Sequence, residues 1–354
     1  MPVPSWPDHT PLTFGVEVAS NDAFGHDAAM MLPTAFTELV GCEVPIQLAP
    51  MGGIVTPELV AAVTGAGGMA MTSMPMAPAS VVAGALDGMA AVAAGPLGFN
   101  LLMPFLDVEV VDAAAARCLY VDFYHGPVDP SLVGRVHDAG TLAGWQVGSV
   151  DQARAAADAG CDLVVVRGTE GGGRMYGTRG LWPLLAAVLD VVEVPVLASG
   201  GIAGGRGLAA ALAAGAAGVR MGTCFVATVE SGAHPRYKEA IVRADAAATV
   251  LTDAFRVGWP DQVTSARVLR SALERSAALA DGVTVARARA GPVTFDVPRF
   301  GVVPPSATSE GDIDAMAMYA GESAALVDAV EPAAQVVART ARQAEELLRR
   351  AAPA

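Results

Sequence analysis

Two glycine-rich turns, each after a short apolar run, constrain the fold of this chain more than any other feature. Residues 194–207 read VPVLASGGIAGGRG, and residues 219–225 read VRMGTCF. Each run resembles a buried parallel strand, so each turn brings backbone N–H groups to a strand's carboxyl end. One such turn is equally well explained as a tight strand-to-helix connection, but two in succession favour a phosphate site. The residues that would hold the phosphate are Gly200, Gly201, Gly222 and Thr223.

Apolar runs of strand length alternate with helical patterns along most of the chain. Strands are predicted at residues 45–50, 68–73, 98–102, 119–124, 144–148, 163–167, 194–198 and 219–221. Helices are predicted between them, near 56–64, 79–89, 108–116, 130–138, 150–159 and 181–189. Strands separated by helices run parallel through right-handed crossovers, and eight such units close into an α/β fold, the (β/α)8 TIM barrel.

A doubly wound open sheet is the alternative fold. That fold places its phosphate loop after the first strand, where the sequence PMGG at 50–53 has no G-x-G-x-x-G pattern. Phosphate turns after the seventh and eighth strands favour the barrel instead.

The repeating pattern covers residues 34–230, and the flanking regions differ from it. Residues 1–33 are rich in proline and aspartate without a period, and we expect them to form an N-terminal extension. Residues 231–310 do not continue the alternation of strands and helices. They are predicted to form a smaller domain, inserted after the eighth strand, that caps the barrel and takes part in substrate binding. Residues 311–354 are expected to supply helices that return to the barrel.

Local patterns predict several elements within these last two regions. A helix is expected around 236–247 and a proline-rich, strand-like tail at 292–305. Helical patterning resumes from residue 315 and again over 332–350.

Charge and cysteine content argue against several classes of function. The formal net charge is −14, which disfavours binding to nucleic acids or anionic membranes. The four cysteines are far apart and form no C-x-x-C pair, so neither a metal site nor a disulfide framework is predicted. The first thirty residues lack the basic end and apolar core of a signal peptide, and prolines interrupt the apolar stretch 88–106. We therefore expect a cytoplasmic protein.

Seven segments carry the motifs of one known family, in the same order. They are PIQLAPMGG (45–53), GFNLLMP (98–104), GCDLVVVRGTEGGGR (160–174), SGGIAGGRG (199–207), VRMGTCF (219–225), AHPRYK (233–238) and YAGES (319–323). On these segments the chain resembles the nitronate monooxygenase family, formerly called 2-nitropropane dioxygenases, which includes related flavin-dependent enoyl reductases. The resemblance implies a (β/α)8 barrel with a capping domain that binds FMN non-covalently.

The resemblance also implies roles for individual residues. Pro50, Met51 and Gly52 would line the flavin ring, and Asn100 would contact it. The phosphate would be held by Gly201, Gly222 and Thr223, which agrees with the argument from the glycine turns.

The chain departs from the family where the chemistry is expected. In the family, a histidine that takes a proton from a nitroalkane follows the glycine cluster, and Arg174 stands at that position here. Arginine stays protonated in proteins, so Arg174 is predicted to bind an anion or to tune the flavin rather than act as a base. Arg167 and Arg220 occupy positions that are usually glutamine in the family, and Cys224 occupies one that is usually arginine.

A positive group near the flavin N1 and C2 oxygen would stabilise the anionic reduced ring. Arg167, at the end of the sixth strand, is the first candidate for this role, and Arg174 is the second. The alternative is structural: these arginines would form salt bridges of the barrel wall with Glu170, or with Asp162 and Asp190.

His125 is the histidine best placed to supply a base. Of the five histidines, it alone directly follows a predicted barrel strand, so it should face the active-site rim. The alternative is that it hydrogen-bonds the backbone of its own loop. Tyr176 is a further candidate as a proton donor, or else a solvent-exposed aromatic residue.

Three functions follow from these residues. The first is an FMN-dependent oxidoreductase of the nitronate monooxygenase type, which oxidises an alkyl nitronate with O2 and needs no base because its substrate is already ionised. The second is an NAD(P)H-dependent flavin reductase or dehydrogenase that acts on an enone or enoyl thioester. The third is a flavin-binding protein without turnover. Each has a small-molecule partner, and the sequence leaves open whether the protein is a homodimer.

Overall fold

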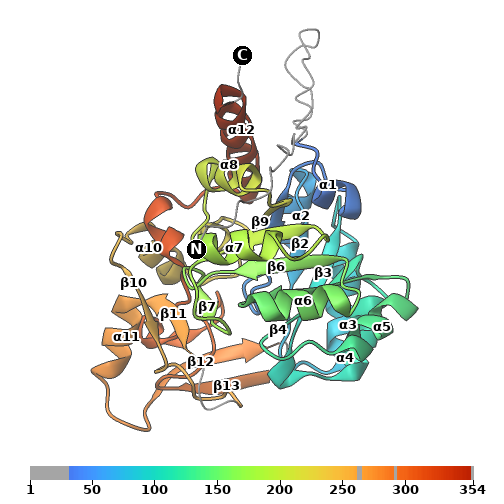
Figure 1. Ribbon diagram of the computed structural model, residues 1–354. Helices are drawn as coiled ribbons and strands as arrows, with labels where there is room; N and C mark the ends of the chain where they lie inside the picture. Colours follow the sequence, from blue (N-terminus) through green and yellow to red (C-terminus); the bar gives the residue numbers. More distant parts are fainter. Residues whose placement is uncertain (1–31, 261–264, 291–292, 352–354) are drawn as a thin grey trace, which may run out of the picture.

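Eight parallel strands form the wall of a barrel in the computed structural model, which describes residues 32–260, 265–290 and 293–351 (Figure 1). The strands are β1 (Ile46–Leu48), β2 (Ala70–Thr72), β3 (Leu97–Leu102), β4 (Tyr120–Tyr124), β5 (Leu142–Val147), β6 (Leu163–Arg167), β8 (Val196–Ser199) and β9 (Gly218–Met221). Their order in the sheet is β1-β9-β8-β6-β5-β4-β3-β2, and a parallel bridge between Gln47 and Met69 joins β1 to β2. The predicted barrel and its eight strands are confirmed. The extension predicted at 1–33 lies outside the described residues except for its last two.

The strands are apolar because both of their faces are covered. In β6, Val164 and Val166 pack outward against the helices, whereas Leu163 and Val165 pack inside the barrel. This alternation follows from the two-residue period of a strand. The short helix α1 (Ala35–Val40) places Phe36 among the interior side chains, so it closes one end of the barrel.

Helices between the strands cover the outside of the barrel. They are α2 (Pro57–Gly65), α3 (Ala79–Ala90), α4 (Val108–Ala115), α5 (Pro130–Asp138), α6 (Val150–Asp158), α7 (Leu181–Leu189) and α8 (Gly205–Ala213). Thr56, Asp107, Asp129 and Ser149 cap four of them, each with a side-chain oxygen that accepts a hydrogen bond from an amide of the first turn. Six of these helices are predicted from the sequence to within one residue at each end.

Shorter elements and a long final helix complete the barrel. The 3-10 helix η1 (Met103–Phe105) follows β3, and α9 (Thr223–Val226) begins at the second glycine turn. The long helix α12 (Ala333–Ala351) lies beside α8 and also packs against α2, which confirms the predicted final helix (Figure 1).

A second group of elements follows α9 and has its own apolar core. It comprises α10 (Pro235–Val242), β10 (Thr249–Thr252), β11 (Ala266–Leu269), α11 (Arg270–Ala277), β12 (Thr284–Ala290), β13 (Val293–Pro298), β14 (Glu310–Gly311) and the 3-10 helices η2 (Ile313–Ala315) and η3 (Glu322–Leu326). Its core includes Tyr237, Phe255, Val268 and Met318. The loop after β6 reaches this group through the short strand β7 (Gly173–Arg174), which pairs with β11.

Two predicted elements differ from the structure. The helix expected over 236–247 ends at Val242, because the Asp245 carboxylate accepts a hydrogen bond from the Ala247 amide and stabilises a turn. The helix expected from residue 315 is wrong. The chain there runs alongside β11, where the Leu269 amide donates a 2.8 Å hydrogen bond to the Met318 carbonyl. The predicted strand-like tail contains β13, paired antiparallel with β12.

Candidate active site

The first glycine turn lies at the C-terminal end of β8. Gly200 and Gly201 have φ angles of 113° and 70°, which residues with a Cβ rarely adopt. A Cβ added to Gly200 would lie 3.1 Å from the carbonyl oxygen of Gly168, so the turn packs closely against the loop after β6. Among the described residues, the amides of Gly200 and Gly201 donate no hydrogen bond to a backbone carbonyl outside the strands and helices. Both amides can therefore bind a ligand.

The second glycine turn brings the predicted phosphate and ring segments together. Gly222 and Thr223 begin α9, where the first helical amides have no partner within the helix. A Cβ added to Gly222 would lie 3.6 Å from the Met51 sulfur, in the turn after β1. The Thr223 hydroxyl accepts a 3.0 Å hydrogen bond from the Gly321 amide.

The turn after β1 lies between its neighbours in the barrel. Pro50, Met51 and Gly52 are all partly buried. A Cβ added to Gly52 would lie 3.3 Å from the carbonyl oxygen of Ser73, in the loop after β2. The segment predicted to line the flavin ring is thus held between the loops that follow β2 and β9.

A cavity of about 520 Å³ opens beside Gly201 and the start of α8. Its far wall belongs to α12, and Arg206, Arg339 and Arg350 line it together with the acidic residues Asp328 and Glu346. The N-terminal amides of a helix attract anions, and Arg206 adds a positive charge, whereas Arg339 is paired with Glu331 and Arg350 with Glu346. The cavity is therefore suited to the phosphate end of a nucleotide.

Arg167 is the last residue of β6, and its guanidinium lies against the glycine loop that follows. Its Nη2 donates a hydrogen bond to the Gly172 carbonyl, and its Cζ lies 5.4 Å from the centre of the Tyr124 ring. Its Nε is buried and has no hydrogen-bond partner in the part of the chain that the structure describes. Burial lowers the pKa of Arg167, and the nearby charge of Arg220 lowers it further. Arginine nevertheless stays protonated, so this partly buried cation can donate a hydrogen bond to an oxygen of a ligand.

Arg174 connects the loop after β6 to the capping elements. Its Nη2 donates a hydrogen bond to the Phe255 carbonyl, and its Cζ lies 4.8 Å from the centre of the Trp259 ring. Its own carbonyl accepts a 2.9 Å hydrogen bond from the Tyr124 hydroxyl. Arg174 is buried, so its charge lies where the barrel and the capping elements meet.

His125 lies directly after β4, with a positive φ of 68°. This conformation is uncommon for residues other than glycine, and such strain is often found at functional sites. Its Nε2 lies 3.2 Å from the Met175 carbonyl oxygen, a backbone contact in the loop after β6 rather than in the loop of His125 itself. Its ring also contacts Tyr176 and Trp259, both with 5.0 Å between ring centroids. Tyr176 is exposed.

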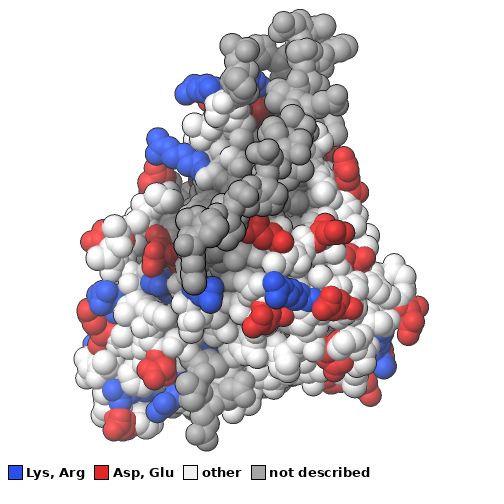
Figure 2. All heavy atoms as spheres, viewed as in Figure 1, with Lys and Arg blue, Asp and Glu red and all other residues white. Residues whose placement is uncertain are grey.

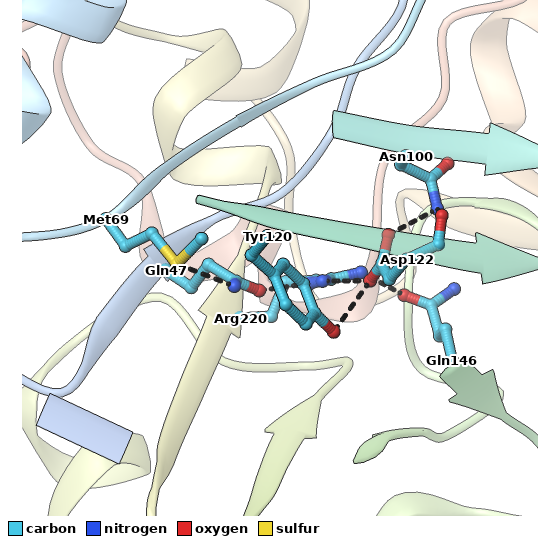
Figure 3. A network of polar contacts seen from close by, with 7 residues as sticks. All are labelled: Gln47, Met69, Asn100, Tyr120, Asp122, Gln146 and Arg220. Atoms are coloured by element: carbon cyan, nitrogen blue, oxygen red, sulfur yellow. Dashed lines mark hydrogen bonds and ion pairs between the residues drawn. The ribbon is translucent and has the colours of Figure 1, made fainter. Parts of the chain in front are cut away.

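Arg220 and Asp122 form a buried ion pair inside the barrel (Figure 3). Arg220 also donates hydrogen bonds to the side-chain oxygens of Gln47 and Gln146, at 2.6 and 3.0 Å. The Asn100 amide donates a 2.7 Å hydrogen bond to the other Asp122 oxygen. Arg220 is therefore neutralised within the wall, and Asn100, predicted to contact the flavin, is held by the same network.

Three members of this network, Gln47, Asp122 and Gln146, are absent from the predicted site. Each is a polar residue within an apolar strand segment, and each is almost fully buried. A buried polar side chain needs a partner, so polar residues in apolar strands are the sequence signal that identifies such a network.

The salt bridges considered as an alternative for the arginines differ from those observed. The Glu170 carboxylate accepts a 2.9 Å hydrogen bond from the Leu181 amide, and Asp162 lies 2.9 Å from His137. Asp190 ends α7. Within the described ranges, Arg167 forms no ion pair with a carboxylate, and Arg220 pairs with Asp122 instead.

Other predictions concern partners and location. On the face shown in Figure 2, basic and acidic side chains are interspersed. The described helices include none that combines the length and apolar character needed to cross a bilayer. The same residues contain no group of three or more histidine, cysteine or acidic side chains arranged to hold a metal ion. The cytoplasmic location stays a prediction, as does the lack of nucleic-acid and membrane partners.

Comparison with known proteins places this geometry in context. A family model described as nitronate monooxygenase matches residues 106–342. A (3aS,4S,5R,7aS)-5-hydroxy-7a-methyl-1-oxo-octahydro-1H-indene-4-carboxyl-CoA dehydrogenase of Rhodococcus jostii is 36% identical over 201 residues, 56% of this chain and 57% of that protein. The chain thus matches less than two-thirds of that relative's length. A probable nitronate monooxygenase of Staphylococcus aureus is 28% identical over 62% of this chain and 75% of that protein.

Solved structures resemble a larger part of the chain. FabK from Thermotoga maritima is 30% identical with a TM-score of 0.75, over 91% of this chain and 99% of that one. Nitroalkane oxidase from Streptomyces ansochromogenes is 28% identical with a TM-score of 0.71, over 90% of this chain and 99% of that one. Both likenesses extend beyond the barrel, because they cover most of the chain.

Proposed function

The chain belongs to the nitronate monooxygenase family, and on this premise we propose that it is an FMN-dependent oxidoreductase that oxidises an alkyl nitronate, or a similar small anion, with O2. The family consists of flavin-dependent oxidoreductases, so a flavin cofactor and an oxidoreductase activity follow from membership. The choice of FMN, of a nitronate and of O2 is the proposal.

Features at the barrel mouth support FMN as the cofactor. The amides of Gly200 and Gly201 have no backbone partner outside the regular elements, and the cavity beside them is lined by arginines and the start of α8. These groups suit a phosphate. The turn containing Met51 lies next to the second glycine turn, so a ring placed there would adjoin the phosphate.

Arg167 is the observation that carries the proposal. It is a partly buried cation without an ion-pair partner among the described residues, and its buried Nε has no hydrogen-bond partner among them. When bound, the flavin would supply the electron-accepting ring for substrate oxidation. Arg167 would stabilise the negative charge that develops beside it, because its own charge is already in place and poorly screened.

Arg174 and His125 would act on the substrate side. A nitronate is already ionised, so the site needs a positive charge rather than a base. Arg174 would supply that charge and help hold the nitronate oxygens. His125 lies at the same mouth and is the side chain that would accept a proton from a neutral substrate.

The test is to purify the protein, record its visible spectrum and mix it anaerobically with propane-2-nitronate, NADH or NADPH. We expect a yellow protein whose flavin is bleached by the nitronate. A colourless preparation that takes up no added FMN would end the proposal.

An NAD(P)H-dependent reductase or dehydrogenase acting on an enone or enoyl thioester is the second candidate. It is favoured by the carboxyl-CoA dehydrogenase name of the Rhodococcus relative, a match at 36% identity. In this case NADH or NADPH, and not the nitronate, would bleach the flavin in the anaerobic experiment.

Arg174→His tests whether one missing base separates this chain from enzymes that oxidise neutral nitroalkanes. We expect 2-nitropropane oxidation to rise on the order of 100-fold over Arg174→Gln, which removes the same charge without adding a base. Oxygen consumption at several pH values measures this, and the rate should increase as the histidine loses its proton. An FMN-bound histidine variant as slow as Arg174→Gln contradicts this explanation. If the wild type also oxidises no nitronate or NAD(P)H, it is a flavin-binding protein without turnover.

A further inference from the structure

Three loops of the barrel meet on one side chain of the capping elements, Trp259. Phe105, after β3, contacts the indole edge-on, with 5.1 Å between ring centroids. His125, after β4, contacts it at 5.0 Å, and Arg174, after β6, places its Cζ 4.8 Å from the ring centre. Loops that follow the strands of such a barrel build its active site. The indole therefore lies at the mouth where substrate must enter.

The polar atom of this indole lacks the partner that its burial requires. Trp259 Nε1 is buried and has no hydrogen-bond acceptor among the described residues, although the residue as a whole is only partly buried. Indole N–H groups usually find an acceptor when buried, because an unmet donor is costly. Contacts with an arginine and two rings fix the orientation of the side chain, so the donor is already positioned before a ligand arrives.

A second tryptophan shows why position matters here. Trp145 Nε1 is also buried without a partner, but Trp145 is a fully buried residue of β5 that stacks on Phe123 at 4.9 Å. Its surroundings are the apolar core of the barrel. Among the tryptophans that the structure describes, Trp259 alone combines an indole N–H without an acceptor with contacts to three loops of the active-site face.

We infer that Trp259 is a specificity-determining residue of the substrate site. Its indole N–H donates a hydrogen bond to an oxygen of the substrate, and its ring limits the size of the group that fits beside Phe105 and His125. The inference rests on the proposed function, because it assigns a residue to the substrate site of that reaction. The substrate class it favours is a compact molecule with an exposed accepting oxygen, such as the nitronate group of a short alkyl chain.

The hydrogen bond can be observed directly, without turnover. Nitrate is planar, carries its charge on oxygen and cannot be oxidised further, so it serves as the probe. The indole N–H signals are recorded in a two-dimensional ¹H–¹⁵N spectrum of the FMN-loaded protein. The signal that disappears in Trp259→Phe belongs to Trp259, and the signal that disappears in Trp182→Phe belongs to Trp182. Trp182 is the control because it is 44% exposed on α7. We expect saturating nitrate to shift the Trp259 signal and leave the Trp182 signal in place. A Trp259 signal that does not move overturns the inference.

Steady-state kinetics with propane-2-nitronate test the same residue in the reaction. Trp259→Phe keeps a ring but removes the donor, so we expect about a tenfold rise in KM with little change in kcat. Trp182→Phe should match the wild type. Trp259→Ala should in addition raise kcat/KM for hexane nitronates relative to propane-2-nitronate. Equal KM values for Trp259→Phe and Trp182→Phe would overturn the inference.

The two proposals fail in different ways. If propane-2-nitronate does not bleach the flavin, the proposed function is wrong whatever the Trp259 signal does. If the flavin is bleached but nitrate does not shift the Trp259 signal, the proposed function stands and the proposed role of Trp259 in substrate binding is wrong. Bound FMN in each variant, measured by absorbance, shows that the variants are folded.

Discussion

Arg167, which is partly buried, differs from the buried Arg174 and Arg220 in what surrounds its charge. Arg220 is paired with Asp122, and Arg174 is engaged by the Phe255 carbonyl and the Trp259 ring. Arg167 instead faces a backbone carbonyl and the ring of Tyr124. A charge that is partly removed from water and has no counter-ion carries a desolvation cost that a bound anion would offset, so Arg167 is the arginine we expect to face the cofactor.

The first prediction concerns the electrostatic effect of Arg167 on the flavin. Arg167→Gln removes the charge and introduces the residue usual at this position in the family. We expect the midpoint potential of the bound flavin to fall by about 30 mV or more, the change that alters a two-electron equilibrium tenfold. Spectroelectrochemical titration measures it. The matched control Arg154→Gln, on the exposed face of α6, should leave the potential unchanged. Equal potentials in both variants would mean that Arg167 does not lie near the ring.

At the scale of elements, the turn between β8 and α8 matters because its backbone conformation presents two amides. Gly201 has a φ of 70°, and a Cβ there would lie 3.1 Å from the Cβ of Glu170. Gly215 lies in the turn at the end of α8 with a φ of 99°, and a Cβ there would meet Leu189 at an ordinary 3.5 Å. Both glycines have a positive φ, which a residue with a Cβ rarely adopts, but of the two only Gly201 lies at the predicted phosphate site.

This pair of glycines separates strain from ligand binding. We expect Gly201→Ala and Gly215→Ala each to lower the free energy of unfolding by about 1–3 kcal/mol, because both force a side chain into a disfavoured conformation. Only Gly201→Ala should weaken FMN binding, by tenfold or more. Urea unfolding and FMN fluorescence titration measure the two effects. If FMN affinity is the same in both variants, the turn after β8 does not hold the phosphate.

Helix α10 supplies a prediction about pH. His234 caps this helix: its Nδ1 accepts a 3.2 Å hydrogen bond from the Arg236 amide, which requires an unprotonated nitrogen. Burial lowers the pKa of His234 below its ordinary value of 6.5, and the charge of Arg236 lowers it further. The folded protein therefore binds fewer protons at this site than the unfolded chain.

The stabilisation from His234 should be complete above pH 6.5, the unfolded value, and should decrease as the pH falls through the folded value. His234→Asn keeps a capping oxygen at any pH, so the difference in stability between wild type and variant should change across this interval. Urea unfolding between pH 5 and 8 measures it. If the free energy of unfolding changes with pH by the same amount in wild type and His234→Asn, His234 does not contribute to the pH dependence.

At the scale of the whole molecule, the Arg220–Asp122 pair joins strands that are not neighbours in the barrel. Asp122 belongs to β4 and Arg220 to β9, and three strands separate them in the sheet order. Gln47 of β1, Gln146 of β5 and Asn100 of β3 complete the network, so five strands share one set of polar contacts in the interior (Figure 3). This network depends on closure of the barrel, because only a closed wall brings these strands to face one another.

Asp122→Asn should therefore destabilise the whole barrel. The substitution leaves the Arg220 charge buried without a counter-ion, which costs about 3–5 kcal/mol of unfolding free energy. The double variant Asp122→Asn/Arg220→Gln removes the unpaired charge, so it should lose less than the sum of the two single variants. Urea unfolding of all four proteins forms a double-mutant cycle. Strictly additive losses would show that the two residues are not coupled.

Much of the barrel could be predicted because its signals are local. Apolar runs with β-branched residues predict the strands, and capping residues such as Thr56 and Ser149 mark where helices begin. The glycine turns are equally local, since Gly200 and Gly201 were assigned to a turn after β8 and both have positive φ. The chain around residue 315 was assigned a helix wrongly, because its pairing with β11 comes from a distant segment.

The sequence by itself determined the order of strands and helices, the glycine turns and the positions of the arginines near the strand ends. Only the tertiary structure decided what each arginine contacts. Arg220 pairs with Asp122, 98 residues away, and Arg174 donates to Phe255, 81 residues away. The physical reason is that periodicity and turn chemistry act over a few neighbouring residues, whereas partners for buried charges are set by closure of the barrel and by packing of the capping elements against it.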